Sequence, residues 1–389
     1  MRAIFTSLPA MGHLNSMMPL AVATRDAGHA VAVCSSPVFA AEVVRFGLQH
    51  LPGGADSLDE FLAPGVPHTG PLRTEWMRRE VFARAAPNRL LPELAAHVAA
   101  WRPDVIVRES SEFAGCVLAE KLGLPHVAVA TGALSARDDH REHFAESLSA
   151  LRQQHGLSPD PEAAMMSRYL GFSLMPPSWD GDARIPITLH FVRYENPDRT
   201  GEELPAYLRH PRDRPMILAA LGTLFNGVPG LFEVIFEALG HLPVDVVAAI
   251  GRDQDLKRFG TIPRNVRIEP WVPQIKVLGR AALFVTHGGF NSAKEALSQG
   301  VPLVVIPIGA DQPYTAERVE ALGLGRSVGA EERQAEIIRA RAREVLEDPT
   351  YRADAEQFAS EMASLPPLSE AVRLVERLAR DRTPIVRDA

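Results

Sequence analysis

Short apolar runs typical of strands alternate with helix-like segments along most of the chain. In the first half, runs such as VIVRE (105–109) and HVAVAT (126–131) are separated by helical patterns, and one helix is expected from about Asn15 to Ala27, ended by Gly28. A parallel pair of strands needs a long crossover connection, usually a helix. The alternation therefore predicts a doubly wound α/β domain with a parallel sheet.

The alternation is interrupted once and then begins again. The stretch from Glu195 to Pro215 is polar and rich in proline, as in a linker between domains. The runs MILAALGT, DVVAAIG and PLVVIPI that follow are nearly all apolar, which indicates strands buried on both faces. We therefore expect two Rossmann-like domains, 1–205 and 212–365, that face each other across a ligand-binding cleft, and a C-terminal helix, 366–389, that packs back on the first domain.

Composition and charge argue against several classes of protein. The formal net charge of -7 at pH 7, without a block of like charges, gives no surface for nucleic acid or for an anionic membrane. The two cysteines, Cys34 and Cys116, argue against a disulfide framework and favour a reducing cytoplasm. Pro9 and Gly12 interrupt the apolar N-terminus, so we expect no secretory signal, and no run of about 18 apolar residues suggests a membrane span.

The stretch HGGFNSAKEALSQG (287–300) follows the apolar run AALFVT and marks a change from strand to helix. His287 stands at the carboxyl end of the strand, the two glycines allow a close approach to the backbone, and Asn291 or Ser292 is expected to cap the helix. Backbone amides at a helix N-terminus hold anions. The stretch therefore suggests a phosphate site, although a lone histidine in a turn more often bonds to a neighbouring loop.

Residues on either side of this turn suit the other parts of a nucleotide sugar. Trp271, in WVPQ, offers a face for a flat heterocycle, and Glu295, one turn past Asn291, offers a carboxylate for ribose hydroxyls. The run PLVVIPIGADQ brings Asp311 and Gln312 to the same rim of the sheet, where they suit sugar hydroxyls. Each also has an ordinary alternative, since Trp271 suits a core, Glu295 a solvated helix face and Asp311 a helix cap.

In order along the chain, WVPQ, HGGFNSAKEAL and GADQ resemble the nucleotide-sugar signature of family 1 glycosyltransferases, which have the GT-B fold. PAMGHLNSMMPLA, from Pro9 to Ala21, resembles the opening loop of that family, and the likeness covers essentially the whole chain in layout. The superfamily includes bacterial antibiotic glycosyltransferases, and the alanine and arginine bias with few lysines resembles a bacterium of high GC content.

The resemblance implies a role for each matching residue. Trp271 would stack on the nucleobase, with Val272 and Gln274 beside it, and Glu295 would bind the ribose. The residues that would hold the diphosphate are His287, Gly289, Asn291 and Ser292, with Gly288 and Thr223 as further candidates.

The transferred sugar would be bound by Asp311 and Gln312. Phe290 stands where plant relatives often have tryptophan, and its ring lacks the indole donor, which leaves the sugar preference open. The segment from about Ser135 to Asp180 supplies apolar groups for a large hydrophobic acceptor, although such groups more often belong to a core. These groups are Phe144, Met165, Met166, Tyr169, Phe172 and Trp179.

His13 is the second informative histidine and is expected in the loop after the first strand. In the resembling family, the matching histidine is the general base that deprotonates the acceptor, and an imidazole can accept a proton at neutral pH. A carboxylate behind it would fix its tautomer. Glu109, at the end of VIVRE, is the candidate, where many relatives carry aspartate, and Glu112 is the alternative. Structural roles for the histidine and for either carboxylate stay open.

Two acidic clusters could suggest a metal. Asp253 and Asp255 form a DQD that we interpret as a solvated loop before a helix, and DDHREH (138–143) is interpreted as a charged surface loop. We therefore expect no metal site, because the helix N-terminus already offers a way to hold a diphosphate.

Together these observations predict a metal-independent, inverting glycosyltransferase. It would move a sugar from a dTDP- or UDP-linked donor, a co-substrate rather than a cofactor, to a hydroxyl of a hydrophobic natural product such as a polyketide, a macrolide or an aromatic compound. A nucleotide-sugar epimerase or hydrolase of the same fold and a noncatalytic nucleotide-sugar-binding protein are the alternatives. Whether the chain is a monomer or a homodimer stays open.

Overall fold

The computed structural model of the chain divides into two compact units. The N-terminal unit is Met1–Thr200 with Ser364–Ala389, and the C-terminal unit is Gly201–Ala363. The predicted boundary at 205–212 falls just after the observed division, and its residues 210–212 lie outside the described part of the chain. The structure describes residues 1–67, 70–132, 139–197, 202–209 and 213–387.

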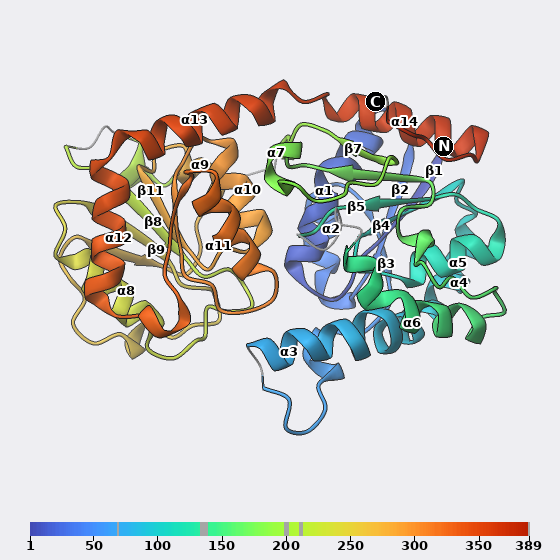
Figure 1. Cartoon of the computed structure of the whole chain (residues 1–389), viewed down its shortest axis with the longest axis horizontal. Helices are drawn as coiled ribbons and strands as arrows, with labels where there is room; N and C mark the ends of the chain where they lie inside the picture. Colours follow the sequence, from blue (N-terminus) through green and yellow to red (C-terminus); the bar gives the residue numbers. More distant parts are fainter. Residues whose placement is uncertain (68–69, 133–138, 198–201, 210–212, 388–389) are drawn as a thin grey trace. The chain divides into compact units, whose positions relative to one another are not determined.

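The N-terminal unit contains a seven-stranded parallel sheet with the strand order β3-β2-β1-β4-β5-β6-β7 (Figure 1). Its strands are β1 (Arg2–Thr6), β2 (Ala30–Ser35), β3 (Gln49–Pro52), β4 (Val105–Glu109), β5 (His126–Val129), β6 (Leu170–Ser173) and β7 (Leu189–Phe191). Its helices are α1 (Met11–Asp26), α2 (Ala40–Arg45), α3 (Pro71–Trp76), the π-helix η3 (Met77–Ala85), α4 (Ala86–Trp101), α5 (Ala114–Leu122), α6 (Asp139–Gln154), α7 (Pro177–Asp180) and α14 (Leu368–Asp381).

The C-terminal unit contains a six-stranded parallel sheet with the order β10-β9-β8-β11-β12-β13. Its strands are β8 (Met216–Ala220), β9 (Asp245–Ala249), β10 (Val266–Glu269), β11 (Leu283–Thr286), β12 (Leu303–Val305) and β13 (Gly325–Ser327). Its helices are α8 (Leu231–Gly240), α9 (Gln274–Leu278), α10 (Phe290–Ser298), α11 (Gln312–Ala321), α12 (Ala335–Glu347) and most of α13 (Pro349–Ser364). The two parallel sheets confirm the predicted α/β class.

Each sheet has a switch point, where the strand order reverses direction. In the N-terminal unit it lies between β1 and β4, and in the C-terminal unit between β8 and β11. Open α/β sheets bind their ligands at the carboxyl ends of the strands at such a point. The topology therefore marks one place in each unit where functional side chains are expected.

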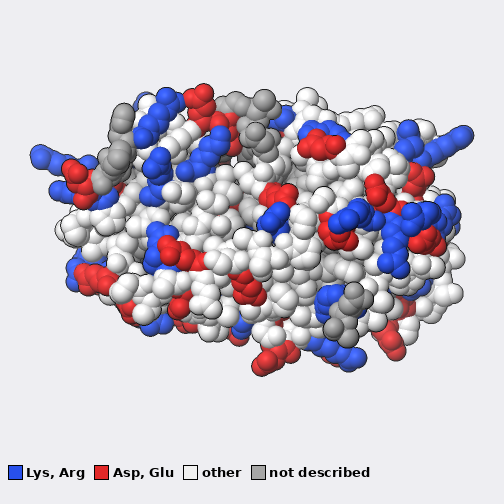
Figure 2. Space-filling model, turned by 90° about the horizontal axis from the view of Figure 1, so that it is seen from above, with Lys and Arg blue, Asp and Glu red and all other residues white. Residues whose placement is uncertain are grey.

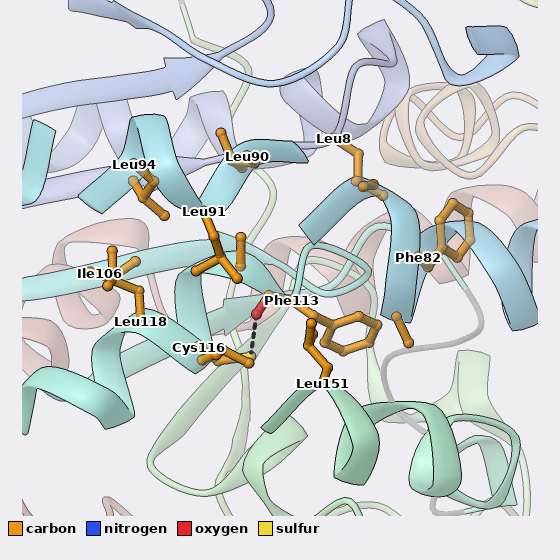
Figure 3. Packing of buried hydrophobic residues seen from close by; sticks show 14 of the residues in the cluster. Leu8, Phe82, Leu90, Leu91, Leu94, Ile106, Phe113, Cys116, Leu118 and Leu151 are labelled. Carbon is orange, nitrogen blue, oxygen red and sulfur yellow. Dashed lines mark hydrogen bonds between the residues drawn. The ribbon is translucent and has the colours of Figure 1, made fainter. Parts of the chain in front are cut away.

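The sheet of the N-terminal unit is buried on both faces. Because side chains alternate along a strand, Ile4 of β1 packs with α4 and α5, whereas Ala3 and Phe5 pack with α1 and α14. Figure 3 shows the first of these cores, in which Leu94 of α4 packs near Ile106 of β4. On the other face, α14 lies against α1 within the N-terminal unit (Figure 1).

Two helices differ from the predictions. α1 begins at Met11 rather than at about Asn15, because the first turn of a helix needs no internal hydrogen bonds from its amides and so accommodates Gly12. His13 therefore lies in a helix, and the prediction that it lies in a loop is wrong. The stretch DDHREH (138–143) was predicted to be a charged surface loop. From Asp139 onward it instead forms the beginning of α6, and residue 138 lies outside the described residues.

The surface in Figure 2 carries acidic and basic side chains side by side. Within the described residues, no helix combines the length and the apolar character needed to cross a bilayer.

Candidate active site

His13 and Glu109 meet at the switch point of the N-terminal sheet. His13 lies in the first turn of α1, which follows β1, and Glu109 is the last residue of β4, the parallel neighbour of β1. The Nδ1 atom of His13 lies 3.0 Å from the Oε1 atom of Glu109. The imidazole is 21% exposed, whereas the carboxylate is fully buried. The structure thus presents an accessible imidazole that is backed by a carboxylate.

The surroundings of Glu109 keep its carboxylate ionised. The Oε2 atom accepts hydrogen bonds from the amide of Ser111 at 2.7 Å and from the hydroxyl of Thr131 at 3.1 Å. Burial raises the pKa of Glu109, but His13 and the Ser111 amide lower it more strongly, so that its pKa lies below the ordinary value. An ionised carboxylate at Nδ1 favours the tautomer of His13 that carries its proton there.

Glu112, the alternative partner, caps a helix. Its carboxyl accepts hydrogen bonds from the Thr6 hydroxyl and from the amides of Ala114 and Gly115, at the beginning of α5. Burial raises the pKa of Glu112 to about 7. The two carboxyls of this turn therefore differ in charge near neutral pH, and the structure places the ionised one, Glu109, against His13.

Arg108, which was not among the predicted site residues, holds the turn that carries both carboxyls. Its fully buried guanidinium donates to the carbonyl groups of Glu109 at 3.2 Å and Ser110 at 2.9 Å. It also reaches the carbonyl of Glu112 at 3.3 Å and that of Met166 at 2.7 Å. The sequence signal for this role was an arginine within the otherwise apolar run of VIVRE, because a buried charge needs several hydrogen-bond partners.

One aromatic ring lies near the imidazole of His13. The ring of Phe82, from the π-helix η3, has its centroid 6.1 Å from that of His13. π-helical turns are rare and are frequent at functional sites. Most of the side chains suggested for the acceptor instead belong to the core, although Met166 and Tyr169 are half-buried. The core members are Phe144, Met165, Phe172 and Trp179.

His287 occupies the switch point of the C-terminal sheet. It directly follows β11, and its imidazole packs so closely against Gly222 and Gly289 that a Cβ atom at either glycine would lie 2.6 Å or 2.5 Å from Nε2. The Thr286 hydroxyl lies 3.3 Å from Nδ1. Burial lowers the pKa of His287 to about 4, so the ring is neutral at pH 7. A neutral imidazole carries a single N–H donor, and the Ala220 backbone is one hydrogen-bond partner of this ring.

The helix that follows His287, α10, begins at Phe290, before both residues that were predicted to cap it. Gly289 is the N-cap of α10, so Asn291 and Ser292 lie in the first turn, and the prediction that one of them caps the helix is wrong. Gly288 has a φ of 83°, which favours glycine, and it lets the chain turn sharply between β11 and α10. With glycine at the cap, no side chain of the N-cap residue covers the first amides of α10.

The residues expected at the nucleobase and ribose lie together. Gln274, the first residue of α9, donates from Nε2 to the Glu295 carboxylate at 2.8 Å. The indole of Trp271 is 39% exposed, Val272 next to it is buried, and the guanidinium of Arg252 lies 4.8 Å from the indole centroid. Arg252 thus lies close to one face of Trp271, and a flat ligand would have to stack on the other.

The residues expected to bind the sugar lie in a constrained turn after β12. The Oε1 atom of Gln312 accepts hydrogen bonds from the amides of Ile308 at 2.6 Å and Gly309 at 3.0 Å, which directs its carboxamide and leaves Nε2 as a donor for a ligand. Between them, Ala310 has a φ of 58°, a strained value for a residue with a Cβ atom. Asp311 follows at the N-cap of α11.

The last candidate for donor binding is Thr223, and the acidic cluster considered for a metal ion is formed by Asp253 and Asp255. Thr223 follows β8 and is exposed. Asp253 accepts a hydrogen bond from Asn226 at 3.1 Å, and Asp255 caps a short 3₁₀ helix through the amide of Lys257. Across the described ranges, no group of three or more His, Cys, Asp or Glu side chains is arranged to hold a metal ion.

Two family models match the chain, those for the N-terminal and C-terminal domains of erythromycin biosynthesis protein CIII-like proteins, over residues 22–170 and 233–378. The L-demethylnoviosyl transferase of Streptomyces niveus is 32% identical, over 94% of this chain and 95% of its own. The chain belongs to the family 1 glycosyltransferases of antibiotic biosynthesis. A 3-alpha-mycarosylerythronolide B desosaminyl transferase of Saccharopolyspora erythraea is 27% identical to this glycosyltransferase, over 98% of this chain and 99% of its own.

The fold of this family 1 glycosyltransferase is also that of a solved relative. The glycosyltransferase VinC, in a crystal structure with dTDP, is 25% identical, with a TM-score of 0.79 over 98% of this chain and 100% of that chain. The predicted family and the GT-B fold are thereby confirmed. The roles of the individual site residues stay predictions, which the geometry above makes specific.

Proposed function

We propose that the protein transfers a sugar, with inversion at the anomeric carbon, from a nucleoside-diphosphate donor to a hydroxyl of a hydrophobic natural product. The observation that carries this proposal is the pair formed by His13 and the buried, ionised Glu109 at a sheet switch point. Relatives named for transfer of desosamine and demethylnoviose support sugar transfer to a natural product. The dTDP in the VinC structure supports a nucleoside-diphosphate donor, with dTDP or UDP as the nucleotide here.

In the proposed reaction, His13 acts as the general base. Because Glu109 faces Nδ1, the proton of the acceptor hydroxyl goes to Nε2. The acceptor oxygen attacks the anomeric carbon as the bond from that carbon to the diphosphate oxygen breaks. A single displacement of this kind inverts the configuration, and Glu109 stabilises the imidazolium that forms.

The donor is proposed to bind to the first turn of α10. Its amides and His287 would meet the diphosphate, Glu295 with Gln274 the ribose, and Trp271 the base. Hydrogen-bond donors that are fixed before the reaction stabilise the charge that builds on the leaving group. We propose that the reaction therefore needs neither a metal ion nor a cofactor beyond the nucleotide sugar.

The sugar and the compartment complete the proposal. Asp311 as acceptor and the Nε2 atom of Gln312 as donor suit a pair of sugar hydroxyls. Both cysteines, Cys34 and Cys116, are free and buried, as suits the reducing environment of the cytoplasm.

The test uses the purified protein with dTDP- and UDP-sugars and a panel of polyketide, macrolide and aromatic alcohols, with and without a chelator. Mass spectrometry should detect a glycosylated acceptor, and NMR should show an anomeric configuration opposite to that of the donor. A retained configuration, or activity lost with the chelator, would contradict the mechanism. Isomerised or hydrolysed sugar formed without acceptor, and no glycoside with any acceptor, would favour an epimerase or hydrolase instead.

A further inference from the structure

Lys294 occupies a position in α10 that suits an apolar residue. It lies on the buried face of the helix together with Phe290 and Leu297, and its side chain is 1% exposed. Lysine is rarely buried to this extent without a partner, because an ammonium group loses its hydration when it leaves water. A charged residue in a helical core position therefore indicates a function that outweighs this loss of stability.

The ammonium group lies near the N-terminal turn of α10. Its Nζ atom donates to the Oδ1 atom of Asn291 at 2.7 Å and lies 5.5 Å from the centroid of the Phe290 ring. Both residues belong to the first turn of the helix, where the helix dipole favours negative charge and disfavours positive charge. Burial and the dipole thus both act against a cation at this place, and the Asn291 oxygen offsets part of their effect.

An anion bound to the same turn would reverse both effects. The first amides of α10 are not covered by a side chain of its N-cap residue, and the proposed donor carries its negative charge on a diphosphate. The Lys294 ammonium donates to Asn291, a residue of this first turn, so a diphosphate bound there would gain a charged partner. Burial lowers the pKa of Lys294 to about 8, while Glu295 raises it, so the group is still mostly charged at pH 7.

We propose that Lys294 supplies a positive charge that binds the donor diphosphate, together with the amides of the first turn of α10. This inference rests on the proposed function, because it assigns a residue to the donor site of that reaction. The hydrogen bond to Asn291 orients the ammonium. The charge of Lys294 would favour a diphosphate over a monophosphate and would discriminate weakly among nucleosides.

The experiment compares the binding of thymidine, dTMP and dTDP, and of the matching uridine series, to the whole protein by isothermal titration calorimetry. In Lys294→Met, the affinity for the nucleoside diphosphate should fall at least about tenfold, as for the loss of a hydrogen bond between charged groups. The affinity for the monophosphate should fall less, and that for the nucleoside should stay unchanged. Lys257→Met, at an exposed lysine of the same unit, should leave all three affinities unchanged.

A second variant separates the charge from the contact with Asn291. Lys294→Gln keeps a donor for the Asn291 oxygen but carries no charge, so it should lose diphosphate affinity much as Lys294→Met does. A thermal melt of each variant without ligand should give an unfolding temperature equal to or above that of the wild type, because a buried cation has been removed.

The outcomes separate the two proposals. If Lys294→Gln binds nucleoside diphosphate as tightly as the wild type, or if both variants weaken nucleoside and diphosphate binding equally, Lys294 acts only through the local structure and this inference is wrong. If the wild-type protein binds no nucleoside diphosphate at all, the proposed function fails and this inference fails with it.

Discussion

The two histidines lie at the switch points of the two sheets, after strands that are not counterparts, and have opposite surroundings. His13 follows β1 and His287 follows β11, and each stands at the switch point of its own sheet. His13 is partly exposed and lies 3.0 Å from the Glu109 carboxylate. His287 is buried against two glycines, and burial lowers its pKa to about 4.

This difference shows that the neighbours of an imidazole decide its chemistry. A carboxylate at one ring nitrogen stabilises the protonated ring, which suits a group that must take up a proton during a reaction. Burial without such a carboxylate keeps a ring neutral, which suits a fixed hydrogen-bond donor. We therefore expect His13 to affect chemistry and His287 to affect binding as well, and the following experiments test this comparison.

The largest effect is expected for His13→Ala. Loss of a general base should lower kcat by about 10²- to 10⁴-fold. The affinity for nucleoside diphosphate should stay at the wild-type value, because the donor is proposed to bind in the other unit. Steady-state kinetics and calorimetry measure the two quantities, and His97→Ala, at another histidine of the N-terminal unit, serves as the control. Wild-type turnover in His13→Ala would rule out its assignment as the base.

The next largest effect is expected for Glu109→Gln, compared with Glu112→Gln. A neutral amide at position 109 cannot stabilise the imidazolium of His13, so kcat should fall about a hundredfold or more. Glu112→Gln replaces a carboxyl that is already half protonated near pH 7 and caps α5, so its turnover should stay close to that of the wild type. Rates measured at pH 7 with saturating donor make the comparison. Equal losses in both variants would mean that the turn, rather than the Glu109 charge, matters.

A smaller effect, on two quantities at once, is expected for His287→Ala. Loss of a hydrogen bond to the charged diphosphate should weaken nucleoside diphosphate binding about 10- to 100-fold and lower kcat as well. Titration calorimetry and initial rates measure these changes, with circular dichroism to verify the fold. A variant that loses turnover but binds dTDP and UDP normally would place His287 with His13 and so remove the distinction between the two residues.

The sequence predicted those features that depend on local pattern. The near-continuous apolar runs of β8 and β12 predicted buried strands, and Gly28, with a φ of 86°, ends α1 as expected. The proximity of His13 and Glu109, which lie far apart in sequence, was expected only from the family resemblance. Their contact follows from the pairing of β1 with β4, which no local pattern specifies.

Features that depend on tertiary contacts were missed. The start of α1 was misplaced because Gly12 disfavours a helix by propensity, whereas the first turn of a helix tolerates a glycine. Arg108 and Lys294 were missed because a single charged residue in an apolar pattern looks like an ordinary interruption. Their burial, and the carbonyl groups or the amide oxygen that they contact, become evident only in three dimensions.

The smallest expected effect is an opposite pH dependence of stability at the two switch points. The folded-state pKa of Glu112, about 7, lies above its ordinary value of 4.5, so its stabilising contribution is complete below pH 4.5 and is lost as the pH rises through 7. The folded-state pKa of His287, about 4, lies below its ordinary value of 6.5, so its contribution is complete above pH 6.5 and is lost as the pH falls through 4.

Urea unfolding between pH 5 and pH 8 measures this difference in the whole protein. Relative to the wild type, Glu112→Gln should become more stable toward pH 8, and His287→Gln should become more stable toward pH 5, each by about 1 to 2 kcal/mol. Neither substituted side chain ionises in this range, so each variant lacks the pH dependence of the residue that it replaces. If the stability of both variants relative to the wild type changes with pH in the same direction, Glu112 and His287 do not have pKa values shifted in opposite directions, and the contrast between them is wrong.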